Sequence, residues 1–168
     1  IVIKFVLCLY LGKKVVDKKR NQIEAGVKFL SATAVMMAGM FIARILFTIF
    51  DFHYTHFDRN TYILPEPLFL WKLSFGMLTV TLFYMIWVLD KVIVQNKFKG
   101  IPAIILIIVG FVVIIYPVET VEDFELMSLI SLVVNMMALL VPAVFSYVGK
   151  HSSGDIRKSA YFIAFGLM

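Results

Sequence analysis

The chain has 168 residues, of which 61% are hydrophobic and 16% charged, and its mean hydropathy is +0.93. Because a soluble domain is about half apolar and a quarter charged, this composition excludes an ordinary soluble protein. The net charge of +5 does not indicate a nucleic-acid-binding protein, since the basic residues lie in short blocks between apolar runs and form no basic face interleaved with aromatic residues.

The apolar residues form long blocks, and a helix needs about 20 such residues to cross the hydrocarbon core of a membrane. In chain order the blocks predict four complete spans with a partial span at each end: 1–11 (partial), 26–50, 68–89, 101–116, 126–148 and 159–168 (partial). We therefore predict an all-α fold, a polytopic transmembrane helical bundle forming one domain over residues 1–168. Because the sequence begins at Ile1 and ends within a new apolar run, we expect a fragment of a longer protein, with seven spans if one more follows.

The loop charges predict the orientation, because short cytoplasmic loops are enriched in Lys and Arg. The second loop contains one basic residue, Arg59, and the charged residues of the fourth loop are all acidic. The odd-numbered loops contain the other eleven basic loop residues: Lys13, Lys14, Lys18, Lys19, Arg20, Lys91, Lys97, Lys99, Lys150, Arg157 and Lys158. We therefore expect a multi-pass protein of the cell membrane with its odd-numbered loops in the cytoplasm.

Two spans carry packing signals. Small residues recur at helical spacing in the second span, including Gly39 and Ala43, and such stripes let helix backbones approach closely. In the fifth span Pro142 leaves the carbonyl group of Ala138 without its helical donor, and Asn135 lies seven residues earlier on about the same face. These patterns predict a packing seam in the second span and a kink in the fifth, with a hinge or a buried polar contact as the alternative.

Arg44 is the most informative residue, because an arginine in a membrane span is costly without a partner or access to the interface. Arg44, Thr48 and Asp51 are four and seven residues apart, so a helix places them on one face near its outer end. Lys72 and Glu66 approach from the same side in the third span and the loop before it. These residues predict an outward-facing cluster in which Arg44 pairs with Asp51 or Glu66, or binds an anionic ligand. The alternative is an arginine that snorkels to the interface beside a structural salt bridge.

The loop after the second span contains Asp51, His53, His56 and Asp58, a dense group of nitrogen and oxygen donors. Such donors bind zinc or a similar divalent ion, so we consider a weak metal site here. The spacing matches no specific ligand signature, and the intervening aromatic residues suit an interfacial loop equally well. The two histidines also suit a sensor of external pH.

No catalytic signature is present. The sequence contains no G-x-S-x-G elbow, no P-loop and no H-E-x-x-H motif, and its loops are too short for a soluble catalytic domain. We therefore expect neither an enzyme nor a bound cofactor.

A resemblance comes from the string Ala43-Arg44-Ile45-Leu46-Phe47-Thr48-Ile49-Phe50-Asp51-Phe52 and the later Leu70-Trp71-Lys72-Leu73. With these strings the chain resembles archaeal multi-pass membrane proteins of unknown function. In layout it is similar to the seven-transmembrane sensor regions found in front of prokaryotic histidine kinases. The resemblance implies that a cytoplasmic signalling domain or protein receives the signal.

Two functions follow as hypotheses. The first is a sensor or receptor module whose outer polar pocket, near Arg44, Asp51, Glu66 and Lys72, binds a small ligand. The second is a small-solute transporter or permease, which favours an inverted repeat and polar residues at the membrane midplane; no repeat is evident here. The lipid bilayer is the one partner that the sequence itself predicts, and it predicts no oligomeric state.

Overall fold

The structure is a computed structural model that describes residues 24–151 and, outside this range, Val6, Leu9, Tyr10, Gly12, Lys13, Arg157, Lys158, Tyr161 and Ala164. The predicted partial spans, 1–11 and 159–168, and the first basic loop lie almost entirely outside the described residues. Every regular element in the described part is helical, and that part contains no strand, so the predicted all-α class is confirmed there.

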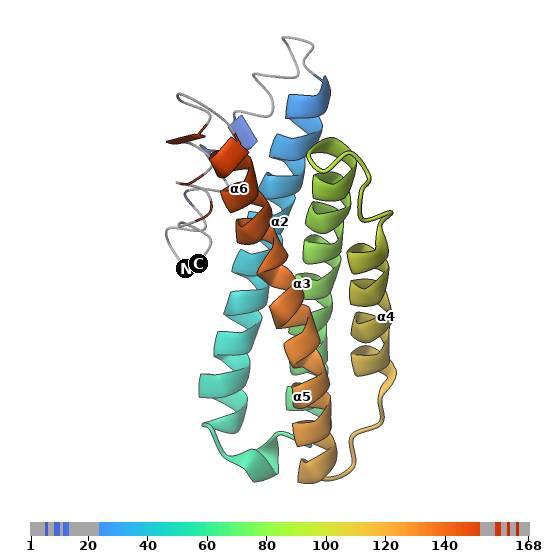
Figure 1. The fold of residues 1–168 in the computed structure, drawn as a ribbon. Helices are drawn as coiled ribbons and strands as arrows, with labels where there is room; N and C mark the ends of the chain where they lie inside the picture. Colours follow the sequence, from blue (N-terminus) through green and yellow to red (C-terminus); the bar gives the residue numbers. More distant parts are fainter. Residues whose placement is uncertain are drawn as a thin grey trace.

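The elements follow one another as an up-and-down bundle (Figure 1). Helix α2 packs along α3, α3 packs along α4, and α4 packs against α5. Their bounds are α2 Glu24–Ile49, the π-helix η1 Phe50–Thr55, the 3-10 helix η2 Arg59–Thr61, α3 Pro65–Val92, α4 Ile101–Ile115, α5 Val121–Ala138 and α6 Leu140–His151.

Three helical segments in the described part are long and apolar enough to cross a membrane: Ser31–Thr55, Pro65–Val92 and Val121–His151. They contain or overlap three of the predicted spans, 26–50, 68–89 and 126–148. The fourth predicted span, 101–116, corresponds to α4, which is apolar but has only 15 residues. At 1.5 Å per residue α4 is about 22 Å long, which is shorter than the hydrocarbon core of about 30 Å. Its boundaries follow from Pro102 in its first turn and Pro117 just after its end.

Capping residues explain where α3 and α5 begin. Helix α3 has Pro65 at its start and Glu66 in its first turn, and both residues suit a helix N-terminus. Helix α5 begins with a reciprocal capping box, in which the Thr120 hydroxyl accepts from the Asp123 backbone N–H and the Asp123 carboxylate accepts from that of Thr120. Both helices therefore begin at residues that are typical of helix N-termini.

The predicted kink in the fifth span is present as a break between α5 and α6. Leu139 separates the two helices, and its backbone N–H donates to the carbonyl oxygens of Met136 and Met137. Pro142 is the third residue of α6, and it has no backbone N–H to donate to the Ala138 carbonyl oxygen. The helix therefore resumes with a bond from Ala143 to the Leu139 carbonyl oxygen, 3.1 Å long.

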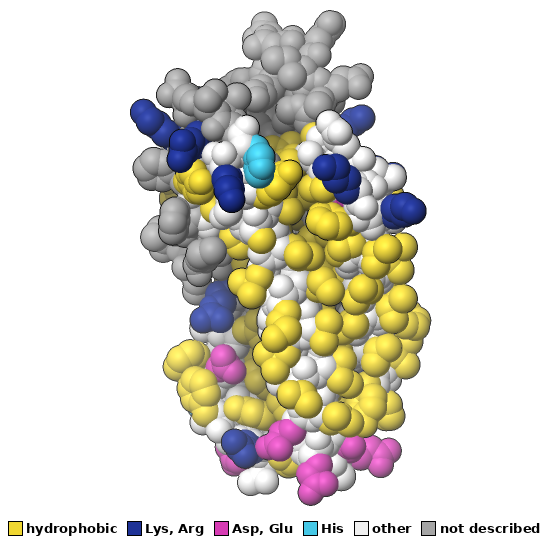
Figure 2. Space-filling model, in the orientation of Figure 1, with side chains coloured by type: hydrophobic (Ala, Val, Ile, Leu, Met, Phe, Trp, Pro, Cys, Tyr) yellow, Lys and Arg dark blue, Asp and Glu magenta, His cyan; other side chains and the backbone are white. Residues whose placement is uncertain are grey.

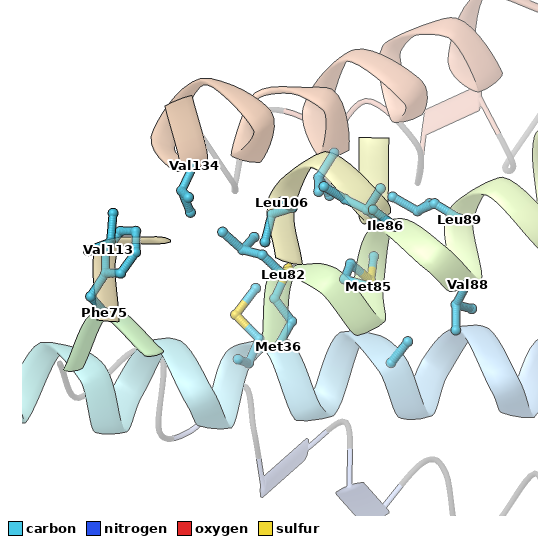
Figure 3. Close-up of a cluster of buried hydrophobic side chains, with 14 of the residues drawn as sticks. Met36, Phe75, Leu82, Met85, Ile86, Val88, Leu89, Leu106, Val113 and Val134 are labelled. Carbon is cyan, nitrogen blue, oxygen red and sulfur yellow. The ribbon is translucent and has the colours of Figure 1, made fainter. Parts of the chain in front are cut away.

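The core lies between α2, α3 and α4 and is closed by α5. Met36, Leu82 and Leu106 come from three different helices and point toward a common centre (Figure 3). Val113 and Val134 extend the same buried cluster toward α5. The residues that occupy this centre are apolar, as the blocks in the sequence require.

Charge separates the two ends of the bundle (Figure 2). We call the end that carries Asp58, Glu66, Glu119, Glu122, Asp123 and Glu125 the acidic end. We call the opposite end, which carries Lys91, Lys97, Lys99 and Lys150, the basic end. Lysine and arginine side chains gather at one end of the visible face and carboxylates at the other.

Candidate functional site

A polar groove of ≈ 390 Å³ lies between α2 and α5, with α3 beneath it. It exists because α2 and α5 both adjoin the centre of the bundle without packing closely against each other. Its lining combines two charged residues, Arg44 and Asp51, with Ser131, Asn135 and a set of apolar side chains, Met40, Ala43, Phe47, Trp71, Phe75 and Leu78. The groove is therefore an amphipathic site in an otherwise apolar bundle.

Aromatic rings form the floor of the groove. Trp71 and Phe75 are stacked, with their ring centroids 5.5 Å apart and their planes 8° from parallel. Phe47 approaches Trp71 edge-on at 6.2 Å. Trp71 and Phe75 lie four residues apart on one helix, and their rings form an apolar, aromatic part of the groove lining.

A further aromatic cluster holds α5 at the acidic end. Phe124 is buried in contact with the rings of Tyr62 at 5.1 Å, Trp71 at 5.4 Å and Phe50 at 6.4 Å. These rings come from α5, the segment before α3, α3 itself and η1. Since they tie α5 to the rest of the bundle beside the groove, they set its width.

Arg44 and Asp51 reach the groove from α2 and from η1. The two side chains interact electrostatically, but no ion pair within 4.0 Å joins Arg44 to Asp51 or Glu66. Thr48, on the same face, donates to the Arg44 carbonyl oxygen at 2.8 Å and does not line the groove. Within the described residues the Arg44 guanidinium has neither a salt bridge nor a hydrogen bond. The expected pair is therefore present as two neighbouring charges that leave space between them.

The wider turn of η1 is a local feature that the sequence did not predict. The Thr55 hydroxyl donates to the carbonyl oxygen of Phe50 at 2.9 Å, so a buried side chain provides a hydrogen-bond donor for a backbone carbonyl group of η1. His56 and Phe57 follow with positive φ angles of 46° and 62°. π-helical turns are rare and recur at functional sites, and this one carries Asp51.

Helix α5 contributes two polar residues, Ser131 and Asn135, that line the groove and lie four residues apart. The Ser131 hydroxyl donates to the Ser128 carbonyl oxygen at 2.6 Å, whereas no described residue forms a hydrogen bond with the Asn135 amide. Asn135 lies about 20 Å along α5 from its acidic end. A polar amide at that depth requires a partner in a membrane, and the groove is where its partner has room.

The same two residues also line a second cavity of ≈ 420 Å³, which continues along α5. That cavity reaches the acidic end, where Arg59 and Glu125 form an ion pair of 3.2 Å. Because Ser131 and Asn135 border both spaces, the two cavities meet along α5. This ion pair was not predicted from the sequence, although Arg59 is the one basic residue in the loops at the acidic end.

Lys72 and Glu66 do not join Arg44 and Asp51. The Lys72 ammonium group donates to the carbonyl oxygen of Tyr116 at 2.7 Å, so it caps the end of α4. Glu66 lies exposed in the first turn of α3 and does not line the groove. The predicted four-residue cluster is therefore divided: two of its members share the groove, and two serve helix ends.

The weak metal site is not assembled. No group of three or more His, Cys, Asp or Glu side chains converges among the described residues, which include Asp51, His53, His56 and Asp58. Asp58 instead caps η2 by accepting from the Asn60 backbone N–H at 3.0 Å. The His53 ring packs against Tyr54 at 5.2 Å. The positive φ angles of His56 and Phe57 turn the chain after η1, between the donors of η1 and Asp58.

Comparison with family models, with curated proteins and with solved structures gave no match to this chain. The resemblance to sensor regions therefore stays a prediction. The groove is the feature of the molecule that bears most directly on function.

Proposed function

We propose that this chain is an integral membrane module of the sensor or receptor type, and that the groove between α2 and α5 binds a small ligand carrying an anionic group. The observation that supports this proposal most is the Arg44 guanidinium, which faces a groove with an aromatic floor and has no ionic partner among the described residues. An arginine in an apolar span is costly, so a function that requires it explains its presence.

The proposed orientation places the acidic end outside the cell and the basic end in the cytoplasm, because lysines concentrate in cytoplasmic loops. The acidic end carries one basic residue, Arg59, whereas Lys91, Lys97, Lys99 and Lys150 lie at the opposite end. In this orientation the groove and the cavity beneath Arg59 and Glu125 are reached from outside.

The charge and polarity of each lining residue determine which part of the ligand it binds. Arg44 pairs with a carboxylate or another planar anion through parallel N–H donors. Trp71 and Phe75 accept the apolar part of the ligand, and the Asn135 amide offers both donors and an acceptor. Asp51 favours a ligand that also carries a donor or a positive charge, and it disfavours a simple dianion.

Benzoate is a suitable first probe, because it combines a carboxylate for Arg44 with a flat ring for Trp71. We expect benzoate to raise the thermal unfolding temperature of the purified protein, and we expect Arg44→Gln to reduce that increase severalfold. Lys72→Gln is the matched control, since Lys72 is engaged by Tyr116 outside the groove. An equal benzoate effect in the wild type and in Arg44→Gln would contradict the proposed ligand site.

A small-solute transporter is the second candidate, and the break between α5 and α6 is the observation that favours it. Transporters place polar residues and broken helices near the membrane midplane, and Asn135 lies one turn before the break. Uptake of labelled benzoate into proteoliposomes separates the two candidates. A receptor binds benzoate without accumulating it, whereas a transporter shows uptake that Arg44→Gln abolishes.

A further inference from the structure

A third cavity lies at the opposite, basic end of the bundle, far from the groove. It has a volume of ≈ 450 Å³ and lies between the loop that joins α3 to α4 and one face of α6. The loop contributes Ile93, Val94, Gln95, Lys97 and Phe98, and α6 contributes Leu140, Ala143, Val144 and Tyr147. Nothing in the proposed receptor function uses this cavity.

The chemistry of the lining is amphipathic. The deeper side chains, among them Leu140 and Val144, are half-buried and apolar, while Gln95, Lys97 and Tyr147 are exposed. An ammonium group and a phenol therefore lie at the edge of an apolar space. This arrangement matches a molecule with a hydrocarbon chain and an anionic head.

The loop that forms one wall is held in a fixed, unusual conformation. Gln95, Asn96 and Lys99 have positive φ angles of 55°, 63° and 50°, a conformation that costs free energy in residues other than glycine. The buried carboxylate of Asp90 stabilises it by accepting from the backbone N–H groups of Phe98 at 3.1 Å and Gly100 at 2.7 Å. Lys97 and Phe98 are thus held beside the cavity before any ligand arrives.

We propose that this cavity binds an anionic phospholipid of the adjoining leaflet, with an acyl chain between the loop and α6 and the phosphate group at Lys97. Charge complementarity favours this occupant, because Lys91, Lys99 and Lys150 lie at the same end of the bundle and add a positive potential. The Tyr147 phenol donates to the phosphate group from α6. A lipid in this site joins the α3–α4 loop to the helix that follows the break.

Native mass spectrometry of the purified protein tests the proposal with equal amounts of phosphatidylglycerol and phosphatidylcholine that carry the same acyl chains. The wild type retains phosphatidylglycerol in preference to phosphatidylcholine. Lys97→Gln lowers that preference about fivefold, the ratio expected for one lysine near an anionic headgroup. Lys99→Gln is the matched control: it removes the same charge from the same loop, but Lys99 does not line the cavity, so the preference falls much less than in Lys97→Gln.

A second variant tests the acyl chain. Ala143 is exposed on α6 and lines the cavity, so Ala143→Phe fills the space without a buried clash and reduces retention of both lipids. Equal preferences in Lys97→Gln and the wild type would overturn the proposal, as would equal losses in Lys97→Gln and Lys99→Gln, which would indicate diffuse attraction. Complete displacement of the lipid by inorganic phosphate would also overturn it, since a headgroup alone would then suffice.

Discussion

Helix α2 has two contrasting neighbours, a close one in α3 and a distant one in α5. Gly39 faces Thr81 of α3, and a Cβ atom built at Gly39 overlaps the Thr81 side chain. Across the groove, the side chains of Arg44 and Asp51 face Ser131 and Asn135 instead. Small residues therefore bring two helices into contact, while charged and polar residues coincide with the interface that stays open.

A second contact between a glycine and a threonine joins α3 to α4. Gly110 faces Thr79, and the Thr79 hydroxyl donates to the Phe75 carbonyl oxygen at 2.8 Å within its own helix. Thr81 satisfies its hydroxyl in the same way, at 2.9 Å from the Met77 carbonyl oxygen. Both threonines thus place methyl groups against glycine without an unsatisfied polar atom. The difference between the seam and the groove is that α3 packs closely against both α2 and α4, whereas α5 borders the open side of α2.

The largest effect is expected where α5 is attached beside the groove. Phe124→Ala removes a buried ring that contacts Phe50, Tyr62 and Trp71, so it lowers the free energy of unfolding by about 3 kcal/mol. Phe111→Ala is the control, since Phe111 is 64% exposed on α4, and it changes stability by less than about 0.5 kcal/mol. Equal losses in denaturant unfolding of the two variants would contradict the role given to this cluster.

The seam itself gives the next largest effect. Gly39→Ala and Gly110→Ala place a methyl group against buried threonine side chains, so each lowers the free energy of unfolding by about 2 kcal/mol. At Gly76 the nearest atom to a new Cβ is the flexible tip of Ile114 at 3.3 Å. Gly76→Ala is therefore neutral or stabilising by up to about 1 kcal/mol when all three variants are compared by denaturant unfolding, because alanine favours helix. A seam variant as stable as Gly76→Ala would break the comparison.

The groove is expected to respond in the opposite direction. Arg44→Met removes a charge without an ionic partner in the described structure, so it leaves stability unchanged or raises it by up to about 1 kcal/mol. In a double-mutant cycle with Asp51→Asn, the coupling energy stays below about 1 kcal/mol, because the two charges interact without an ion pair within 4.0 Å. A large loss in Arg44→Met that Asp51→Asn restores would instead reveal the close pair that the sequence suggested.

The smallest effect is expected at the ion pair above the second cavity. Arg59 and Glu125 are 76% and 59% exposed, so Arg59→Gln or Glu125→Gln costs about 0.5 kcal/mol or less, and added salt reduces the cost further. Unfolding measured at low and high ionic strength provides the check. A loss that persists in high salt would mean that this pair closes the cavity as a structural element.

Much of the fold could be predicted from the sequence. Long apolar blocks indicated the helices of the described part, the small residues around Gly39 indicated a seam, and Pro142 indicated the break after α5. The bounds of α4 were predicted to within one residue, because Pro102 and Pro117 bracket the apolar run. The hydrogen bond from Lys72 to the Tyr116 carbonyl oxygen, which caps α4 from α3, could not be predicted. That contact joins residues far apart in the sequence, and spacing alone does not reveal it.

The candidate site could be predicted only in part. Helical spacing placed Arg44 and Asp51 on one face, and both line the groove. Lys72 and Glu66 were also assigned to this cluster, because the sequence indicates the end of the bundle at which they lie but not the side chains that they contact. Ser131 and Asn135 were missed as site residues, although two polar residues four apart in an apolar helix are a usable signal.

The most direct test of the account is accessibility of the groove from outside the cell. In a Cys8→Ser background, which removes the single cysteine, Asn135→Cys places a thiol in the groove and Thr79→Cys places one in the seam. The account predicts that a membrane-impermeant methanethiosulfonate reagent added outside modifies Asn135→Cys rapidly and leaves Thr79→Cys unmodified. Modification of Asn135→Cys only from the cytoplasmic side, or as slowly as Thr79→Cys, would contradict an outward-facing groove.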